Sequence, residues 1–336
     1  MKPRRNLITD VEGLSVGQAH DEAAASGVTV ILADRPVIAA VDVRGGAPAS
    51  RETETLRPEN LVQEIDAIVF AGGSVHGLAA GDGVAAWLGA RGRGFALGGG
   101  AGVPSSPIVP AACLYDLANG GAKDWGEDPP YRTLGRIAAG TATPDFDIGT
   151  AGAGFGARAG GLPGGIGSAS ATMANGGVVG ALAAVNSFGS VIAPGSGQFW
   201  AAPFEIDDEF GGLGVSQAPV FHQTWGLAKA SAAGGLNTTL ACVATDVALS
   251  RVELLRVAVM AQDGLARAIR PAHTPFDGDI VFALSTGLRE LPCDGRRPLA
   301  IARIGATAAD VVARAIARGV FHAKGFGRHQ HDETLG

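Results

Sequence analysis

The stretch Asn237-Thr-Thr-Leu-Ala-Cys-Val-Ala-Thr-Asp246 follows a pair of glycines at positions 234 and 235. The glycines predict a loop, and the apolar run over residues 240–244 predicts a buried strand that enters the interior of a sheet. Thr238 therefore stands where a loop turns into a core strand. A loop that simply enters a strand is the ordinary structural interpretation of this pattern, and the chemistry of a threonine at this place offers a second one.

A threonine at the start of a core strand can act as a nucleophile on its own chain. Its hydroxyl can attack the carbonyl of Asn237, form an ester by an N-to-O shift, and release the upstream segment to water. The product begins with Thr238, whose free amine has a pKa of about 7.7–8.0 and can serve as the general base for the hydroxyl. This interpretation predicts cleavage between Asn237 and Thr238, into residues 1–237 and 238–336.

Short apolar runs rich in β-branched residues alternate with helical patterns along the chain. The predicted strands cover residues 28–32, 37–43, 67–70, 178–185, 240–244 and 280–284. The predicted helices cover residues 250–269, 307–317 and 77–88, and a capping box of Ser250 and Glu253 opens the first of them. Strands mixed with helices, with no linker between them, predict a layered α/β (α+β) fold in a single domain, residues 1–336.

Two acidic residues come directly before the last predicted strand, in the sequence Phe276-Asp277-Gly278-Asp279. One interpretation is an Asp-Gly-Asp turn in solvent. The other is a pair of carboxylates at the mouth of a strand, where they hold and polarise a neighbouring hydroxyl or ammonium group. The remaining ligands of a calcium-binding loop are missing, so we expect neither a metal nor another cofactor.

Asn186 follows the predicted strand 178–185 at the point where the chain leaves the sheet. The amide of an asparagine is a good hydrogen-bond donor to an oxyanion. Asparagine before a turn is also common for purely structural reasons. Asn186 is therefore a candidate oxyanion donor with an ordinary alternative beside it.

Two glycine-rich segments carry incomplete motifs. Residues 152–156 have the glycine spacing of a dinucleotide-binding loop, but Gly-Gly-Leu-Pro-Gly-Gly follows where the helix should begin. Ser74 follows a predicted strand as the nucleophile of an esterase does, yet His76 occupies the place of the second glycine in Gly-x-Ser-x-Gly. We expect Ser74 to cap the helix that follows and keep a Ser74-based esterase as an alternative.

The composition bounds the possible partners. Of 336 residues, 46% are hydrophobic and 17% charged, with a formal net charge of −6, and the one basic cluster, residues 2–5, is too short to predict a nucleic-acid partner. No run of about 18 apolar residues is present, so we expect no membrane span. Cys113, Cys242 and Cys293 are few and widely spaced, which is typical of reduced thiols in a cytoplasmic protein.

Taken in order, these segments resemble peptidase family S58, the DmpA-like family of self-processing aminopeptidases and oligoamide hydrolases, over nearly the whole chain. The matching motifs are Ile8-Thr-Asp-Val-Glu-Gly-Leu-Ser-Val-Gly, Phe70-Ala-Gly-Gly-Ser-Val-His-Gly-Leu, Pro107-Ile-Val-Pro-Ala-Ala, Gly152-Ala-Gly-Phe-Gly-Ala, Gly165-Ile-Gly-Ser-Ala-Ser, Leu182-Ala-Ala-Val-Asn, Leu236-Asn-Thr-Thr and Asp263-Gly-Leu-Ala-Arg-Ala-Ile-Arg-Pro-Ala-His-Thr-Pro-Phe-Asp-Gly-Asp279. The Asn-Thr pair resembles the branch that includes nylon-oligomer hydrolases.

The resemblance implies a four-layer αββα sandwich like that of N-terminal-nucleophile hydrolases, cut into a large and a small subunit. It implies Thr238 as the nucleophile and Asn186 as a donor on the oxyanion side. It also implies that Asp277 and Asp279 orient the new terminus and that Tyr115 is an active-site tyrosine. The expected protein is a closed homo-oligomer, a tetramer or larger, that hydrolyses amide bonds of peptides or small amides.

One departure from the family concerns a lysine that its members often carry before the Gly-Gly pair of the glycine-rich loop. This chain has Leu162-Pro163 there, and Arg158 is the nearest cation. Because arginine stays protonated at any working pH, Arg158 could bind substrate or stabilise negative charge but could not act as a base. The alternative outside the hydrolases is a non-catalytic relative that binds a small amine or amino acid without cutting itself.

Overall fold

Helices and strands are mixed along the chain as the sequence predicts. The computed structural model describes residues 4–96, 102–217, 228–229, 237–291 and 296–325. The α-helices in this part are α1 (Ala79–Gly89), α2 (Tyr131–Gly140), α3 (Arg251–Ala268) and α4 (Arg297–Phe321). The strands are β1 (Leu14–Asp21), β2 (Ser26–Val43), β3 (Ser50–Arg51), β4 (Glu64–Ala71), β5 (Ala111–Cys113), β6 (Arg158–Ala159), β7 (Leu162–Pro163), β8 (Gly165–Thr172), β9 (Val178–Asn186), β10 (Thr238–Val247) and β11 (Ile280–Arg289).

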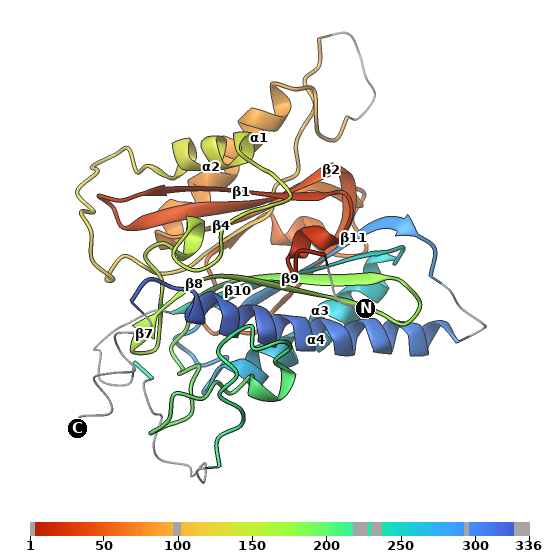
Figure 1. Ribbon diagram of the computed structural model, residues 1–336. Helices are drawn as coiled ribbons and strands as arrows, with labels where there is room; N and C mark the ends of the chain where they lie inside the picture. Colours follow the sequence, from red (N-terminus) through yellow and green to blue (C-terminus); the bar gives the residue numbers. More distant parts are fainter. Residues whose placement is uncertain (1–3, 97–101, 218–227, 230–236, 292–295, 326–336) are drawn as a thin grey trace.

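Two layers of strands lie face to face, and helices cover the outer side of each layer (Figure 1). The helices α1 and α2 pack on the layer that contains β1 and β4, and α3 and α4 pack on the layer of β8, β9, β10 and β11. This arrangement confirms the predicted four-layer αββα fold in a single domain. None of the described helices combines the length and the apolar character that crossing a membrane requires.

The long strand β2 connects the two layers. Its first half pairs with β1 and β4, and its second half pairs with β11. The ladder between β2 and β4 shifts register between Leu32 and Val37, where the intervening Pro36 is exposed and has no N–H to donate to the ladder. The predicted strands 28–32 and 37–43 are therefore two halves of one irregular strand.

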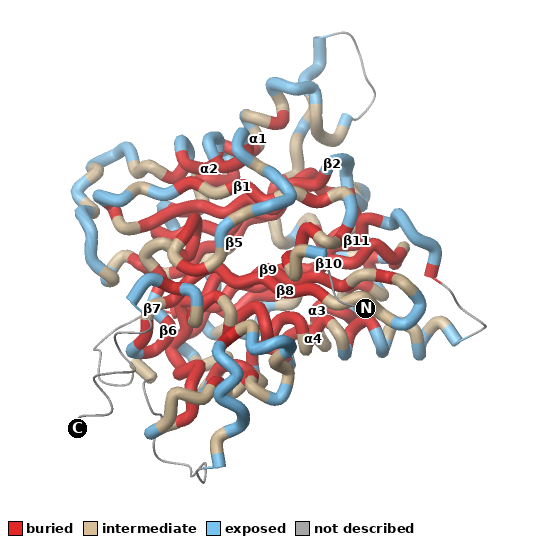
Figure 2. Tube along the Cα trace, in the orientation of Figure 1, coloured by how far each residue is buried: buried red, intermediate tan, exposed pale blue. Residues whose placement is uncertain are grey.

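Three apolar clusters fill the spaces between neighbouring layers, and buried residues follow the strands through both layers (Figure 2). Between the two sheet layers, the rings of Phe70 in β4 and Phe282 in β11 lie with centroids 6.1 Å apart. Successive residues of β10 belong to different clusters: Leu240 packs between the sheet layers and Ala241 packs towards α3 and α4. Burial on both faces explains the continuous apolar run of this strand.

Local sequence signals account for some helix ends and miss others. At α3 the Ser250 hydroxyl accepts a hydrogen bond from the backbone nitrogen of Glu253, whose carboxylate accepts one from the backbone nitrogen of Ser250, so the capping box is confirmed. The helix predicted over 307–317 is the C-terminal part of the longer α4. Helix α2 was not predicted, because it follows a proline-rich stretch that has the composition of a loop.

The prediction that Ser74 caps the following helix is wrong. Ser74 is the first residue of the 3-10 helix η3 (Ser74–Leu78), Gly73 occupies the cap position, and no side-chain cap hydrogen bond is formed. The buried carboxylate of Asp116 instead accepts a hydrogen bond of 2.7 Å from the backbone nitrogen of Gly73. A side chain from a distant segment thus satisfies a donor that a cap residue would satisfy locally.

Two of the three cysteines fall in the described part of the chain. Cys113 and Cys242 are buried and form no disulfide. Cys293 lies outside the described residues, as do Leu236 and the glycine pair at positions 234 and 235.

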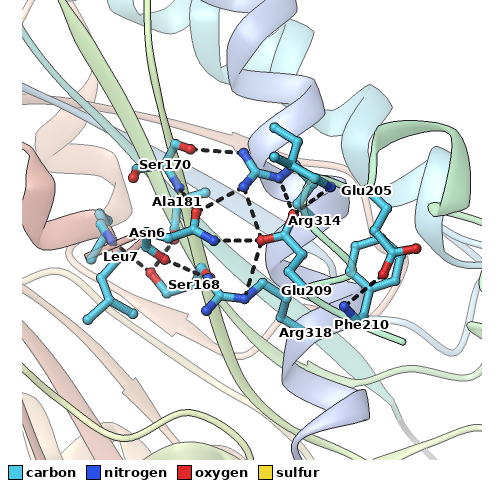
Figure 3. A network of polar contacts seen from close by, with 12 residues as sticks. Asn6, Leu7, Ser168, Ser170, Ala181, Glu205, Glu209, Phe210, Arg314 and Arg318 are labelled. Atoms are coloured by element: carbon cyan, nitrogen blue, oxygen red, sulfur yellow. Dashed lines mark hydrogen bonds and ion pairs between the residues drawn. The ribbon is translucent and has the colours of Figure 1, made fainter. Parts of the chain in front are cut away.

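A buried polar network ties α4 to the N-terminal segment and to β8 (Figure 3). The guanidinium of Arg314 donates to both carboxylate oxygens of Glu209, at 2.5 and 3.0 Å, and to the side-chain oxygen of Asn6 at 2.9 Å. It also donates to the carbonyl of Ser170 at 2.8 Å. Helix α4 is therefore bound by charged hydrogen bonds to three segments that precede Thr238.

Candidate active site

The ends of three neighbouring strands meet at one end of the sheet. Thr238, the first residue of β10, is the cross-strand partner of Asn186, the last residue of β9. On the other side, Asn237 forms a parallel bridge with Asp277, just before β11 begins. The register of these strands brings predicted site residues from three separate stretches, including Asp279, to one place.

The hydroxyl of Thr238 lies beside the bond that it is predicted to cut. It donates a hydrogen bond of 2.5 Å to the carbonyl oxygen of Asn237, and the backbone nitrogen of Gly278 donates one of 2.7 Å to the same oxygen. Thr238 and Asn237 are 2% and 1% exposed. In such a buried setting, a backbone donor aimed at a carbonyl oxygen stabilises the negative charge that forms on that oxygen during nucleophilic attack.

Asp279 holds the backbone next to Thr238. Its carboxylate accepts hydrogen bonds from the backbone nitrogen of Thr239, at 2.8 Å, and from the backbone nitrogen of His273, at 2.9 Å. The ring nitrogen Nδ1 of His273 lies 2.9 Å from the same carboxylate. The carboxylate of Asp279 therefore contacts Thr239, the residue after the predicted nucleophile, and also holds the backbone and ring of His273.

Asp277 is a second buried carboxylate of the site. It accepts hydrogen bonds from the backbone nitrogen of Phe188, at 3.2 Å, and from the backbone nitrogen and hydroxyl of Thr274, at 3.0 and 2.6 Å. Burial raises its pKa, and the negative charge of Asp279 raises it further. With Asp277 and Asp279 only 1% and 2% exposed, the interpretation of this segment as a turn in solvent is wrong.

Asn186 is fully buried, and both ends of its amide are bonded. The oxygen accepts from the backbone nitrogen of Arg158, at 2.9 Å, and from the side chain of Asn119, at 3.0 Å. The amide nitrogen donates to the carbonyl of Tyr115 at 2.9 Å and retains one further hydrogen to donate. The structure thus brings the main chains of Tyr115 and Arg158 to Asn186. The side chain of Arg158 is exposed. The predicted side-chain roles of Tyr115 and Arg158 stay predictions.

Lys229 is a site residue that the sequence reasoning missed. Its ammonium group donates a hydrogen bond of 2.7 Å to the side-chain oxygen of Asn237, and its backbone nitrogen donates to the carbonyl of Phe188 at 3.0 Å. The pKa of Lys229 is lowered to about 7, mainly by burial and also by the positive charge of Arg158, while the charge of Asp277 acts in the opposite direction. The available signal was that Lys229 is the one lysine in the sequence between β9 and β10.

The structure does not favour the Ser74 esterase. Ser74 has a left-handed backbone with φ of 52°, but in the described part of the chain no hydrogen bond links its hydroxyl to His76 or to another base. A hydrolytic serine needs such a base to accept its proton. Among the residues that the structure describes, no group of three or more His, Cys, Asp and Glu side chains is placed to hold a metal ion.

A comparison with protein families covers nearly the whole chain. The model of peptidase family S58 matches residues 6–333. The chain belongs to peptidase family S58. As a member of this family it is a hydrolase of amide bonds.

Named relatives of this S58 chain cover most of its length. An uncharacterized aminopeptidase of Mycobacterium tuberculosis is 44% identical over 95% of this chain and 94% of that protein. A 6-aminohexanoate-oligomer endohydrolase of Kocuria sp. is 32% identical over 92% of this chain and 84% of that protein.

Solved structures share the fold at lower identity. A Burkholderia sp. beta-aminopeptidase superposes with a TM-score of 0.69 at 23% identity, covering 95% of this chain and 87% of that one. The L-aminopeptidase D-Ala-esterase/amidase of Ochrobactrum anthropi, described as a variant of the Ntn hydrolase fold, has a TM-score of 0.67 at 21% identity, with 96% and 88% covered. At such identities the likeness establishes the fold alone.

Proposed function

We propose that this S58 chain is a self-cleaving N-terminal-threonine amidohydrolase of the aminopeptidase type. The observation that carries the proposal is the contact between the Thr238 hydroxyl and the Asn237 carbonyl, with Gly278 donating to the same oxygen. A nucleophile, a carbonyl and a donor for the developing oxyanion meet there in a buried site. These are three of the groups that an acyl transfer needs, beside a base for the hydroxyl proton.

The first reaction cuts the chain itself. Oγ1 of Thr238 attacks the carbonyl carbon of Asn237, and the bond between that carbon and the Thr238 nitrogen breaks as the nitrogen gains a proton. The hydroxyl loses a proton and the leaving nitrogen gains one, so the product is an ester on Thr238 with a free amine. Water then hydrolyses the ester, which leaves a carboxylate on Asn237 and restores the hydroxyl.

The second reaction uses the same groups on a separate substrate. The amine of Thr238 takes the hydroxyl proton, Oγ1 attacks the substrate carbonyl, the amine product leaves with a proton, and water releases the acyl group. In this proposal Gly278 and Asn186 donate to the oxyanion, with Tyr115 beside Asn186. The carboxylates of Asp277 and Asp279 hold the ammonium form of the new terminus by their charge.

We propose peptides, amino acid amides and short oligoamides as substrates, with Arg158 in contact with the substrate. The relatives named aminopeptidase and 6-aminohexanoate-oligomer endohydrolase support this class, because both names describe hydrolysis of an amide bond. The resemblance to the family also supports a closed homo-oligomer, and the low cysteine content supports a cytoplasmic location.

The test is the intact mass of the purified full-length protein, together with an assay on an amino acid amide. We expect two polypeptides of 237 and 99 residues, residues 1–237 and 238–336, that remain associated. N-terminal sequencing of the smaller one should give Thr-Thr-Leu-Ala. A single intact chain that hydrolyses the amide, or a small fragment with another first residue, would overturn the proposal.

A further inference from the structure

The first cleavage lacks the base that the mature enzyme is proposed to use. In the intact chain the nitrogen of Thr238 belongs to a peptide bond, and an amide nitrogen does not accept a proton at neutral pH. Another group must therefore take the hydroxyl proton before the terminal amine exists. The candidates are the titratable side chains around the Asn237–Thr238 bond.

The acidic residues and the histidine are engaged elsewhere. Asp277 and Asp279 each accept three hydrogen bonds, two of them from backbone nitrogens in each case. His273 is bound to Asp279 through both its backbone and its ring, and no hydrogen bond joins it to Thr238. These contacts orient the loop before β11, and none of them places a base against the Thr238 hydroxyl, which donates to the carbonyl of Asn237.

Lys229 contacts the residue whose carbonyl is attacked. Its Nζ atom lies 2.7 Å from the side-chain oxygen of Asn237, and its backbone is anchored to Phe188. We infer that Lys229 is the base of the self-cleavage reaction: its neutral amine takes the hydroxyl proton of Thr238. The inference rests on the proposed function and deepens it by separating the base of the precursor from the base of the mature enzyme.

Burial and one nearby positive charge make the neutral amine of Lys229 accessible near neutral pH. Burial is the main reason that its pKa falls to about 7, and Arg158 on β6 adds to the effect. Asp277, in the loop before β11, raises the pKa of Lys229 and so opposes this effect. The charge of Asp279 acts in turn on Asp277, and Asp279 is bonded to His273. An ordinary surface lysine, with a pKa of about 10.4, would be protonated at pH 7 and unable to accept a proton.

The proton balance of the step is complete without another reactant. The neutral Lys229 amine accepts the Thr238 proton as Oγ1 bonds to the carbonyl carbon of Asn237, which gives an oxyanion and an ammonium group. The oxyanion then collapses, the carbon–nitrogen bond breaks, and the ammonium returns the proton to the Thr238 nitrogen. A positioned side chain transfers a proton by direct contact or through one water molecule, and Lys229 contacts the residue next to Thr238.

Three lysine variants test the inference, with cleavage of freshly synthesised full-length chains followed over time by intact mass. Lys229→Met should slow cleavage by about 100-fold or more, the usual effect of losing a general base. Lys229→Arg keeps the positive charge and a donor to Asn237 but cannot lose its proton, so it should be as slow as Lys229→Met. Lys123→Met is the matched control, because Lys123 is also half-buried with a lowered pKa but contacts the carbonyl of Ala24.

The dependence of the cleavage rate on pH is a second measurement, and a lysine with only a structural role would not change it. Below pH 7 the amine is protonated, so the rate should rise about tenfold per pH unit up to roughly pH 7 and then level off. Arg158→Gln removes a positive charge that lowers the pKa of Lys229, so the midpoint should move to higher pH. Both results together would support Lys229 as the base.

Each contrary outcome has a distinct meaning. If Lys229→Arg cleaves at the wild-type rate, or if the midpoint does not move in Arg158→Gln, Lys229 only positions Asn237 and the inference is overturned. If Lys229→Met cleaves normally while Thr238→Ala stays intact, the inference fails but the proposed function stands. If wild-type chains never cleave, the proposed function itself fails.

Discussion

The backbone nitrogen of Gly278 donates a 2.7 Å hydrogen bond to the carbonyl oxygen of Asn237, the oxygen that the Thr238 hydroxyl also contacts. Gly278 lies between the two buried carboxylates, so three consecutive residues supply one backbone donor and two negative charges. A Cβ atom on Gly278 would lie 2.7 Å from Oγ1 of Thr238, closer than real Cβ contacts. Glycine therefore permits the close approach of this loop to the hydroxyl.

Gly278→Ala should slow self-cleavage by about tenfold or more, because the added methyl group displaces the hydroxyl or the loop, and a loss of 1.4 kcal/mol in transition-state stabilisation costs that factor. The measurement is the time course of cleavage by intact mass. Gly89→Ala is the control, since among the described residues its Cβ would meet only the Pro107 ring, at an ordinary 3.7 Å. Cleavage of Gly278→Ala at the wild-type rate would contradict the proposed geometry around the carbonyl.

Substitutions of Thr238 should distinguish its role as a nucleophile from its contribution to the stability of the fold. Thr238→Ala should remain a single 336-residue chain without hydrolase activity, at a stability cost of about 1–2 kcal/mol. Thr238→Ser keeps the hydroxyl and should cut more slowly, because it loses the χ1 restriction of a β-branched residue. Thr238→Cys should also cleave, as a strong nucleophile. Electrophoresis and an amide-hydrolysis assay read out all three.

Thr239→Ala is the internal control for this series. Thr239 points to the opposite face of β10, and its buried hydroxyl has no hydrogen-bond partner among the described residues, so its removal should leave cleavage intact. If Thr239→Ala blocked cleavage while Thr238→Ala permitted it, the register of the mechanism would be wrong by one residue.

The single variants Asp279→Asn and Asp277→Asn should both fold, but self-cleavage, turnover or both should be slower than in the wild type. In Asp279→Asn one oxygen becomes an NH₂ group that faces a backbone donor, and an unsatisfied buried donor costs about 1–3 kcal/mol. Asp246→Asn is a matched control, because Asp246 is also buried but binds Val178 and Arg289 at the far end of β10. Wild-type rates in both test variants would reduce the pair to a structural role.

Arg314→Met should weaken the attachment of α4 to the rest of the fold. The substitution removes the main ion-pair partner of Glu209, whose side chain is only 8% exposed. Removing one partner of a buried ion pair typically lowers the free energy of unfolding by about 3–5 kcal/mol. Denaturant unfolding measures the loss, and in the processed protein we expect the two fragments to separate at a lower denaturant concentration. Arg303→Met, an exposed change on the same helix, should alter the free energy of unfolding by less than about 0.5 kcal/mol. Equal stability of the two variants would show that the network does not hold the fragments together.

Much of the fold is accessible from local patterns, and the misses have identifiable causes. The capping box of Ser250 and the apolar run of β10 are encoded within a few residues, so both were predicted. Helix α2 was missed because tertiary packing of Tyr131 and Leu134 stabilises it, and the preceding prolines suggest a loop. The prediction of a Ser74 cap was wrong because the carboxylate of Asp116, from another segment, already accepts the hydrogen bond from the backbone nitrogen of Gly73.

The sequence by itself determined that a threonine begins a core strand and that two acidic residues precede a second one. These features follow from strand periodicity and turn composition, which act over short stretches of chain. Only the tertiary structure decided that Lys229 reaches the side chain of Asn237, and that a backbone nitrogen, Gly278, reaches its carbonyl. A backbone nitrogen is present in nearly every residue, so the sequence does not show which one will act as a donor. Contacts between separate segments depend on the path of the loops and on the register of the strands, and a shift of one residue in a strand moves every side chain to the other face.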